Sequence, residues 1–328
     1  MSLVKLSELD ASILRILLAD GRVSFEDVAE ACGVSSNVAW KRFRLLERRG
    51  VIAGATVQVN FADFGYDALA TLLISVEAQR IDEVMDLVCR VPEVRANRQY
   101  NSVFNVRAIA TLKDLNELDH VKQVIKARLP ILGLKTYVWT GVRNIPENLG
   151  LSDDWSGSLR QIVGRLGFRE FNRGLIKVDD LDKQIMHRLV SDGRISFSRV
   201  AKDIGVSTDT VVKHYHKLRE AGSLKACIQI NSSLLGYASI LDFNIAFTSP
   251  EGVSSKVVGS LAGIDDVIVI TKTSGDYDLQ VTAMVRDIPE LFEIQEKVSR
   301  ISGVTRIDVS ARKVPDGWPT RMQYISTF

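Results

Sequence analysis

The sequence has few of the features that mark secreted, membrane-spanning or metal-binding proteins. Its three cysteines, Cys32, Cys89 and Cys227, form no CxxC pair. So sparse a set indicates a reducing compartment and argues against a disulfide framework or a structural zinc site. We expect all three to be small buried or half-buried side chains. The longest apolar stretch, near Leu69–Val76, is far too short to span a bilayer. No export signal is visible, so we expect a cytoplasmic protein without a membrane partner.

The chain also has no large excess of positive or negative charge, and it lacks the common catalytic motifs. The chain has 42 Lys and Arg against 40 Asp and Glu, a formal net charge of +2. The total therefore says little about partners, and the position of the charges matters more. The sequence contains no glycine-rich phosphate loop, HExxH motif or nucleophile elbow, and no Ser, His and Asp set placed to act together. It predicts no catalytic residue, no bound metal and no cofactor.

The sequence does contain a long internal repeat. The segment Asp20–Phe25, with the sequence DGRVSF, returns as Asp192–Phe197, with the sequence DGRISF. The offset of 172 residues holds without a gap as far as Gly50 and Gly222. A period this long indicates duplication of a domain pair and not a short solenoid repeat.

The first part of each copy predicts three helices. In the first copy, apolar residues recur at helical spacing until an Asp-Gly pair stops them. Ser24 is a plausible N-cap for a second helix, and Gly33 suits a left-handed turn before a third helix over Ser36–Arg49. A strand follows in both copies. The pattern predicts winged-type helix-turn-helix domains at residues 1–60 and 178–231.

The second part of each copy alternates strands with helices. The first copy predicts strands at 68–76, 94–99, 104–110 and 134–139 and helices at 82–90 and 114–127. The second predicts strands at 238–247, 267–273, 279–285 and 304–310 and helices at 254–261 and 288–300. The order βαββαβ is ferredoxin-like and predicts an α+β chain with such domains at 61–140 and 232–313. Because their helices cover one face of each sheet, we expect pairing, in a homo-oligomer or an internal pseudo-dimer.

Two segments have no counterpart in the repeat. Residues 141–177 contain Pro146 and a Gly/Ser cluster, followed by apolar residues at helical spacing over 159–166. They predict a linker with a short helix. Residues 314–328 form a C-terminal tail.

The third helix of the first copy carries the excess of charge that the whole chain lacks. Between Ser36 and Gly50, five Lys and Arg side chains oppose one Glu, the pattern expected of contact with phosphates. The side chains off its apolar stripe, and so the predicted DNA-facing ones, are Ser36, Asn37, Trp40, Lys41 and Arg44. Asn37, Lys41 or Arg44 would contact base edges, and the other arginines phosphates. Trp40 suits either DNA or a neighbouring domain.

The corresponding helix of the second copy is less basic. Its predicted DNA-facing residues are Thr208, Lys213, His216 and Lys217. Asp209 would repel phosphates. His214 and His216 are two residues apart and so lie on different faces of the helix, which disfavours a metal site. We expect this helix-turn-helix to bind DNA less well, or mainly to support packing.

Taken together, these motifs resemble the Lrp/AsnC (feast/famine) transcriptional regulators. The resemblance rests on the Leu-Asp…Ile opening, the Asp-Gly-Arg-x-Ser and Gly-Val-Ser segments and the basic third helix, and it covers nearly the whole chain except the linker and tail. It implies binding of double-stranded DNA, dimerisation of the sensing domains (RAM domains) sheet to sheet, and a small-molecule effector, commonly an amino acid, at their interfaces. An effector acts by binding two arrangements of the protein with different affinities.

The resemblance also places the effector at a Gly-Asp turn between the second and third strands of the sensing domain. The second copy keeps this turn, and the predicted effector-binding residues are Thr273, Ser274, Gly275, Asp276 and Asp278. Backbone N–H groups of such a turn could face a carboxylate, and an Asp could accept from an ammonium group. The aligned residues of the first copy, 101–105, lack both Gly and Asp. We expect that copy to have lost or altered its effector site.

Two other interpretations stay open. Siroheme decarboxylase is similar to this family in fold, and such an enzyme needs clustered His, Tyr and Arg side chains for an anionic tetrapyrrole and for proton transfer. Only His120 lies in either sensing domain, although Arg95, Arg98, Tyr100 and Arg107 surround the altered turn. The second alternative is a regulator that has stopped binding DNA, which the basic third helix disfavours.

Overall fold

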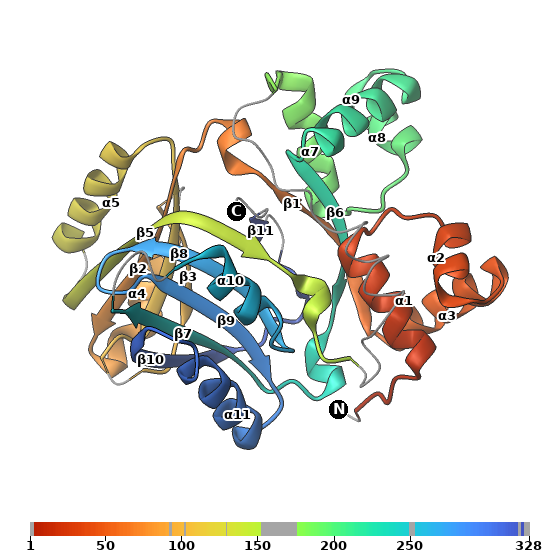
Figure 1. Cartoon of the computed structure of the whole chain (residues 1–328). Coiled ribbons are helices and arrows are strands. Elements are labelled where there is room, and N and C mark those ends of the chain that lie inside the picture. Colours follow the sequence, from red (N-terminus) through yellow and green to blue (C-terminus); the bar gives the residue numbers. More distant parts are fainter. Residues whose placement is uncertain are drawn as a thin grey trace. The chain divides into compact units, whose positions relative to one another are not determined.

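The chain forms two compact units, and each unit combines parts of both copies (Figure 1). The computed structural model describes residues 3–91, 94–101, 103–128, 130–151, 176–248, 253–320 and 323–324. The helix-turn-helix unit contains Met1–Phe64, Arg143–Tyr237 and Val314–Phe328. The sensing unit contains Gly65–Val142 and Ala238–Lys313. The duplicated domains are therefore sorted by type, with like paired with like.

The helix-turn-helix unit contains the predicted three helices from each copy. In the first copy these are α1 (Glu8–Ala19), α2 (Phe25–Cys32) and α3 (Ser36–Arg48), followed by β1 (Ile52–Val59) and the 3-10 turn η1 (Phe61–Phe64). In the second copy they are α7 (Asp180–Ser191), α8 (Phe197–Ile204) and α9 (Thr208–Glu220), followed by β6 (Leu224–Ile230) and η4 (Ser232–Leu235). Each pair of short helices is joined by a tight turn. At the first turn, Gly33 is left-handed, with φ of 64°, as predicted.

Serine caps set where the second and third helices begin. The side chain of Ser24 accepts a hydrogen bond from the backbone N–H of Asp27 at 3.0 Å, and Ser35 accepts one from Val38 at 3.4 Å. Each cap satisfies one of the N–H groups that the first helical turn leaves unpaired. The predicted N-cap at Ser24 is confirmed.

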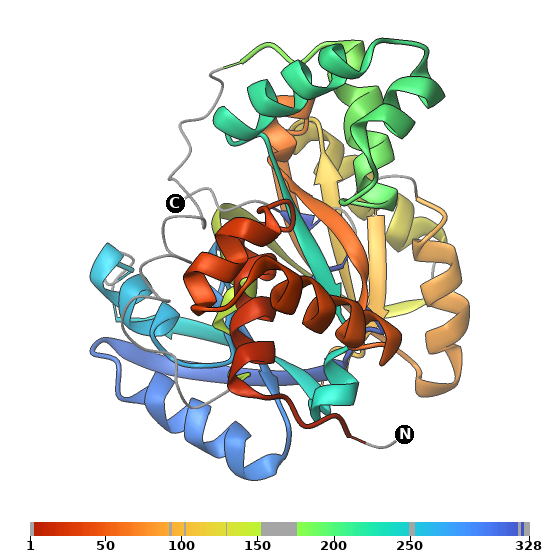
Figure 2. The ribbon, with the colours of Figure 1, turned by 90° about the vertical axis from the view of Figure 1, so that its right-hand side faces the viewer.

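The two helix-turn-helix domains are joined through their strands. β1 pairs antiparallel with β6, with Ala55 opposite Ile228 and Val57 opposite Ala226, and Figure 2 shows this ribbon together with the two bundles. Part of the predicted tail belongs to this sheet, because β11 (Gln323–Tyr324) pairs parallel with β1. Trp318 is also buried, and its backbone exchanges two hydrogen bonds with Ile230.

Helix α1 is buried over most of its length, in part by the segment that follows the first sensing domain. Ile13, Leu14, Ile16, Leu17 and Leu18 are fully buried. The guanidinium of Arg15 donates to the carbonyl of Leu149 at 3.3 Å, just beyond the 3-10 turn η3 (Pro146–Asn148). The first residues of the predicted linker are thus ordered against α1. The short helix predicted over 159–166 lies outside the described residues.

The sensing unit confirms the two predicted βαββαβ domains. The first contains β2 (Ala68–Val76), η2 (Ala78–Arg80), α4 (Ile81–Val88), β3 (Val94–Arg98), β4 (Val106–Leu112), α5 (Leu115–Arg128) and β5 (Ile131–Asn144). The second contains β7 (Ser239–Phe247), α10 (Ser255–Ala262), β8 (Val267–Ser274), β9 (Leu279–Val285), α11 (Ile288–Ser299) and β10 (Val304–Lys313).

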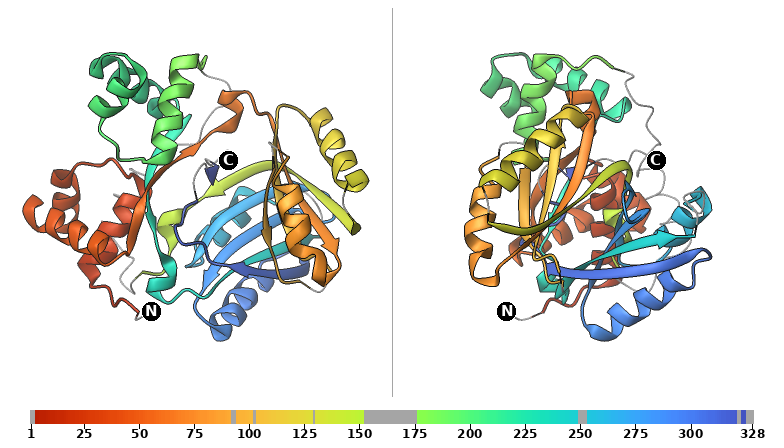
Figure 3. Two further views of the ribbon diagram at one scale, coloured as in Figure 1. Left: turned by 180° about the vertical axis from the view of Figure 1, so that it is seen from behind. Right: turned by 90° about the vertical axis from the view of Figure 1, so that its left-hand side faces the viewer.

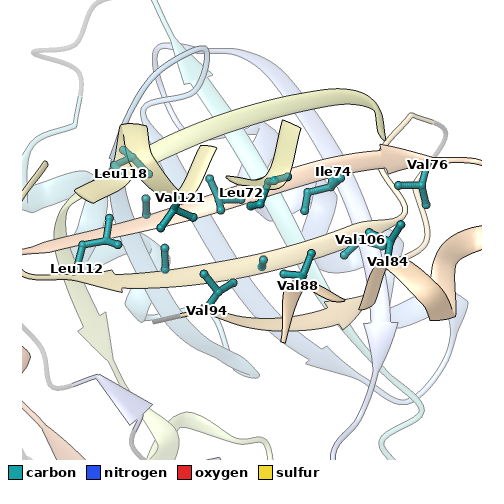
Figure 4. Close-up of a cluster of buried hydrophobic side chains, with 14 of the residues drawn as sticks. Leu72, Ile74, Val76, Val84, Val88, Val94, Val106, Leu112, Leu118 and Val121 are labelled. Atoms are coloured by element: carbon teal, nitrogen blue, oxygen red, sulfur yellow. The ribbon is translucent and has the colours of Figure 1, made fainter. Parts of the chain in front are cut away.

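The core of the first sensing domain lies between its strands and its two helices. In Figure 3 (right), α4 and α5 cover one face of the strands, and Figure 4 shows the side chains between them. Leu72 and Ile74 of β2, Val106 of β4 and Val84 of α4 are fully buried there. Alternate residues of the strands point to the other face. That face carries polar side chains such as Thr71 and is turned toward the second sensing domain.

The two sensing sheets join into one sheet within the chain. The strand order is β10-β7-β9-β8-β5-β2-β4-β3, so the copies meet between β8 and β5. The strands at the two ends of this order, β10 and β3, are also linked. Ala311 of β10 forms an antiparallel bridge with Tyr100, which follows β3. An internal pseudo-dimer, one of the two predicted arrangements, is therefore present. Assembly between chains stays a prediction.

The cysteines and the lengths of the helices can be compared with what the sequence predicted. Cys227 is buried and Cys32 half-buried, as expected, and burial raises their pKa values to about 12 and about 11. The expectation was wrong for Cys89, which is exposed because it follows the last turn of α4 on its outer face. Among the described helices, none is long and apolar enough to cross a membrane.

Candidate nucleic-acid interface and effector site

Helix α3 presents the predicted residues on one exposed face. Its buried stripe consists of Ala39, Phe43 and Leu46. The side chains on the opposite face are all exposed: Ser36, Asn37, Trp40, Lys41 and Arg44. Trp40 is 48% exposed, so it does not pack into a neighbouring domain within the described structure. The surface has the polarity that a helix needs in a major groove.

One arginine counted in the basic excess of α3 turns away from this face. Arg42 places its Nε 3.1 Å from Asp10 Oδ1 and donates to Ser7 Oγ at 2.8 Å. It holds α3 on the start of α1, and its predicted phosphate contact stays a prediction. Arg44 pairs with Glu47 at 2.6 Å on the surface, and such an exposed pair contributes little and is easily exchanged for a phosphate.

The face of α9 differs from that of α3. Thr208, Lys213 and His216 are exposed as predicted, but Lys217 is half-buried. The Lys217 Nζ lies 2.6 Å from Asp182 Oδ2 and donates to the carbonyl of Lys177 at 3.1 Å. Lys217 thus holds α9 on α7, much as Arg42 holds α3 on α1, and its DNA-facing role stays a prediction.

A small cluster beside Lys217 has the donor types of a metal site. One ligand atom each from Asp179, Asp182 and His214 lies within 4.8 Å of the others. Asp182 is fully buried, and its pKa is lowered because hydrogen bonds from Lys217 and His214 outweigh the effect of burial, which alone would raise it. The ammonium group of Lys217 already supplies the positive charge that this carboxylate requires. The arrangement is explained by helix packing without an ion.

The repeated Asp-Gly-Arg turns hold the two helix-turn-helix domains together. The backbone N–H of Gly21 donates to the carbonyl of Ala226 at 2.9 Å, and that of Gly193 donates to Ala55 at 3.0 Å. A Cβ on Gly21 would lie 2.7 Å from the Cα of Cys227. Each turn therefore needs glycine because it approaches the strand of the other copy.

The arginine of each turn contacts aromatic rings of the other copy. Arg22 donates to the carbonyl of Ile195 at 2.5 Å and lies 4.2 Å from the Phe197 ring centroid. Arg194 donates to the carbonyl of Gly21 and lies 5.0 Å from the Phe43 ring centroid. Burial lowers the pKa of both arginines, yet a guanidinium stays charged in proteins. Sequence analysis missed this role, although the appearance of the motif in both copies was the available signal.

The predicted effector turn contains side chains that hold it in place and residues that are exposed. Thr273 donates through Oγ1 to the carbonyl of Tyr277 at 2.8 Å, and Asp278 Oδ2 accepts from the N–H of Phe247 at 2.8 Å. These two side chains hold the turn in place. Ser274, Gly275 and Asp276 are exposed. They are the members of the predicted set that could contact an effector.

Residues from two other strands complete the surroundings of this turn. Asp276 accepts a hydrogen bond from Lys135 of β5 at 2.7 Å, which lowers the pKa of its carboxyl group. Arg306 of β10 donates to the Asp276 carbonyl at 3.1 Å and lies 4.5 Å from the Tyr277 ring centroid. Tyr277 packs near Tyr137, with ring centroids 5.8 Å apart. Burial raises the pKa of Tyr137 to about 12, so the phenol stays neutral.

Sequence analysis did not find Lys135, Tyr137 or Arg306. They come from strands that are distant in the chain, and no local pattern marks them. The cluster combines a carboxylate, two cations and two aromatic rings, which is the chemistry required to hold both charged ends of a small zwitterion.

The altered turn of the first copy serves strand pairing. Tyr100 exchanges backbone hydrogen bonds with Ala311, and Asn101 Nδ2 donates to the carbonyl of Val309 at 3.2 Å. Asn105 occupies the position of Asp278 and exchanges hydrogen bonds with the Val76 backbone. Residues of the turn are thus hydrogen-bonded to β10. Loss of its effector site stays a prediction.

Helix-turn-helix domains joined to ferredoxin-like sensing domains define a class of ligand-responsive, DNA-binding regulators. The model for winged helix-turn-helix DNA-binding domains matches residues 6–53, and that for AsnC-type helix-turn-helix domains matches residues 178–219. The model for the Lrp/AsnC ligand-binding domain matches residues 249–311, which include the predicted effector turn.

Curated relatives give the same result. The HTH-type transcriptional regulator FL11 of Pyrococcus furiosus is 32% identical over 133 residues, which are 40% of this chain and 85% of that protein. An uncharacterized HTH-type regulator of Pyrococcus abyssi is 28% identical over 130 residues, 40% of this chain and 86% of that protein. The chain belongs to the Lrp/AsnC family of transcriptional regulators, and each match has the length of one of its two copies.

Solved structures of one protein match both copies at once. The siroheme decarboxylase NirDL aligns with 97% of this chain and 94% of its own, with a TM-score of 0.63 and 18% sequence identity. At this identity the match shows a shared fold. The tandem architecture is therefore also found in a protein described as an enzyme.

Proposed function

We propose that this chain is a cytoplasmic transcriptional regulator that binds DNA chiefly through α3 and responds to an amino-acid-like effector at the turn 273–278. The observation that carries the DNA part is the exposed face of α3. Asn37, Lys41 and Arg44 lie there together, and Arg48 and Arg49 are exposed at the end of the helix. Amide and guanidinium groups are the common readers of base edges in the major groove.

The second helix-turn-helix would add weaker contacts. At the positions of Asn37 and Arg48, α9 carries the exposed acids Asp209 and Glu220. Each would lie near phosphates and reduce the favourable electrostatic free energy of binding. Lys213 and His216 remain available. We therefore propose that α9 positions the protein and that α3 provides most of the affinity.

A gel-shift assay tests this division. The probe is the DNA upstream of the protein's own gene, and the variants are Lys41→Ala/Arg44→Ala and the matched Lys213→Ala/His216→Ala. The first should weaken binding at least about tenfold, since a good base contact is worth roughly 1–3 kcal/mol. The second should weaken it less. If wild-type protein binds neither this DNA nor random genomic fragments, at low or physiological salt, the proposal fails.

The effector part rests on the exchangeable contact at Asp276. The Lys135 ammonium group donates to this exposed carboxylate. The ammonium group of an amino acid could take its place, while its carboxylate faces Arg306 or the N–H groups of the turn. Because Lys135 and Arg306 belong to strands on either side of the turn, such a ligand would change how the two sensing domains are held together.

Calorimetric titration with a panel of amino acids tests the effector site. We expect one site per chain, with affinity lowered at least about tenfold by Asp276→Ala, because an ion pair to a charged group is lost. The matched control is Asp119→Ala, an exposed acid on α5 that pairs with Lys122 at 2.9 Å. Binding at both halves, with affinity unchanged by Asp276→Ala, would contradict the proposal.

A second candidate is a tetrapyrrole enzyme similar to siroheme decarboxylase, and the full-length structural match favours it. The residues that would support it are dispersed in this chain. His120 is exposed on α5, Arg98 pairs with Asp82 at 2.5 Å on the surface, and Arg107 is buried against Gln280. An absorbance titration with iron-uroporphyrin decides the matter. We expect no shift of the porphyrin band, whereas saturable binding would support the enzyme as the function of this chain.

A further inference from the structure

We infer that one copy of this chain occupies a non-palindromic operator, and that the half-site under α3 is recognised through thymine methyl groups by Val38 and Trp40. The inference rests on the proposed function, because it assumes that the helix-turn-helix unit binds DNA. It adds the stoichiometry of the complex, the symmetry of the operator and the base chemistry that each half-site presents.

A single chain already has the backbone arrangement of a symmetric DNA-binding dimer. In the β1–β6 pair, Ala55 lies opposite Ile228 and Val57 opposite Ala226. The second copy lacks one residue shortly after Gly222, so the offset becomes 171 and Asn60 aligns with Asn231. Ala226 is therefore the repeat counterpart of Ala55, and Ile228 that of Val57, so a local twofold axis exchanges these two pairs. The turn-to-strand hydrogen bonds of Gly21 and Gly193 are exchanged by the same axis. Paired recognition elements of this kind contact two half-sites.

The side chains on the two exposed helix faces do not share this symmetry. Only Lys41 and Lys213 are identical among the exposed positions. The remaining counterparts are Ser36 and Thr208, Asn37 and Asp209, Val38 and Thr210, Trp40 and Val212, Arg44 and His216, and Arg48 and Glu220. An Asn pairs with adenine and an Arg with guanine, whereas an Asp accepts from cytosine. A twofold backbone with unlike side chains requires two half-sites of unlike sequence.

Val38 and Trp40 are two large apolar side chains two residues apart, so they lie at opposite edges of the exposed face of α3, with its charged residues between them. Val38 is 40% exposed and Trp40 is 48% exposed. Their counterparts Thr210 and Val212 are half-buried. The thymine methyl group is the apolar feature that the major groove presents. Within the described residues nothing else covers Val38 and Trp40, and burying them against such methyl groups would remove apolar surface from water.

Selection from a pool of random duplexes tests stoichiometry and symmetry. For wild-type protein we expect a non-palindromic consensus and, by native mass spectrometry, one chain per duplex. A graft that gives α9 the face of α3 (Asp209→Asn, Thr210→Val, Val212→Trp, His216→Arg, Glu220→Arg) should make the consensus palindromic. The converse graft on α3 (Asn37→Asp, Val38→Thr, Trp40→Val, Arg44→His, Arg48→Glu) should do the same with the other half-site. Since either graft could fail to fold, both are checked by thermal unfolding, and the wild-type consensus is decisive by itself.

Replacement of thymine by deoxyuridine in the selected duplex tests the methyl contacts, because it removes only the methyl group. In the α3 half-site we expect a loss of roughly fourfold in affinity per contacted methyl, the effect of about one buried CH₂. The same replacement in the other half-site should change affinity less than about twofold. Val38→Ala/Trp40→Ala should abolish the difference between thymine and uracil.

The outcomes separate this inference from the proposed function. Absence of DNA binding would remove both. A palindromic consensus for the wild type, or two chains on each duplex, would overturn the asymmetric operator while DNA binding stands. Equal affinity for thymine and uracil duplexes would overturn the role of Val38 and Trp40.

Discussion

In the helix-turn-helix unit, the two copies use the same residues where they hold each other and different residues on the exposed faces of α3 and α9. Gly21 and Gly193 approach the partner strand in the same way, and Arg22 and Arg194 each lie on aromatic rings of the other copy. On the exposed recognition helices, in contrast, nearly every position differs. Duplication within one chain allows this outcome, because the contacts that hold the copies together stay fixed while each surface changes independently.

In the sensing unit the two copies also differ at a buried position. Asp242 of β7 is fully buried, with Arg312 Nε 2.8 Å and Arg107 Nε 3.8 Å from its carboxylate. At the equivalent strand positions of the first copy, Trp139 donates to Thr71 Oγ1 at 2.9 Å. The second copy has a buried ion pair where the first has a neutral hydrogen bond. Removal of one partner should therefore have unequal effects in the two copies.

The largest expected effect is at this pair of positions. Asp242→Asn removes the carboxylate charge beside the buried Arg107 and the half-buried Arg312, and breaking a buried ion pair costs about 3–5 kcal/mol. Thr71→Val, the matched change in the first copy, removes one neutral hydrogen bond and should cost about 1 kcal/mol. Chemical denaturation of the two variants measures both. Equal losses would show that the two sensing domains are not differently stabilised.

The next effect concerns the contacts that the copies share. Gly193→Ala places a Cβ within the backbone of Thr56 on β1, and overpacking of this kind costs roughly 1–3 kcal/mol. Gly259→Ala is the control, because that glycine lies in α10 with nothing within 4 Å of the added Cβ. There, helix propensity predicts a gain of up to about 1 kcal/mol. Thermal unfolding distinguishes them, and a destabilised Gly259→Ala together with a neutral Gly193→Ala would contradict the account.

The buried ion pair also predicts a dependence of stability on pH. Burial alone would raise the pKa of Asp242, but Arg312 and Arg107 outweigh it and lower the pKa to about 2. An unfolded Asp has a pKa of about 3.9, so the carboxylate of Asp242 binds a proton less readily in the native state than in the unfolded state. The stabilisation is complete above about pH 4 and is lost as the pH falls toward 2, by about 2–3 kcal/mol. Denaturation of wild type and Asp242→Asn between pH 5 and 2 should show the two curves converging, and a constant difference would exclude this cause.

The smallest expected effect is at the proposed effector turn. The Lys135–Asp276 pair is exposed on both sides, and exposed pairs contribute about 0–1 kcal/mol. Asp276→Ala should therefore leave the thermal midpoint nearly unchanged while it weakens effector binding. A large loss of stability would indicate a structural role for the carboxylate and would weaken its assignment to a ligand.

The sequence was sufficient to predict the elements of each copy but not how the copies meet. Apolar periodicity, Ser24 as a cap and Gly33 as a turn are local signals, and the structure confirms them. The contact of Arg22 with Ile195 joins residues from different copies, and no local pattern encodes it. The directions of Arg42 and Lys217 were missed for a related reason. Each pairs with the Asp of a Leu-Asp opening, Asp10 for Arg42 and Asp182 for Lys217. The burial of these carboxylates depends on how α1 and α7 pack, which the local sequence does not show.

The central claim is that the two copies contribute unequally to DNA binding. The salt dependence of DNA affinity tests it most directly. Arg48→Glu/Arg49→Ala gives α3 the residues that α9 carries at the same positions. Each lost phosphate contact lowers the slope of log affinity against log salt concentration by about 0.9. The account predicts a slope reduced by about two, whereas the converse variant Glu220→Arg/Ala221→Arg should raise it. An unchanged slope in both variants would contradict the claim that α3 carries the electrostatic contacts with DNA.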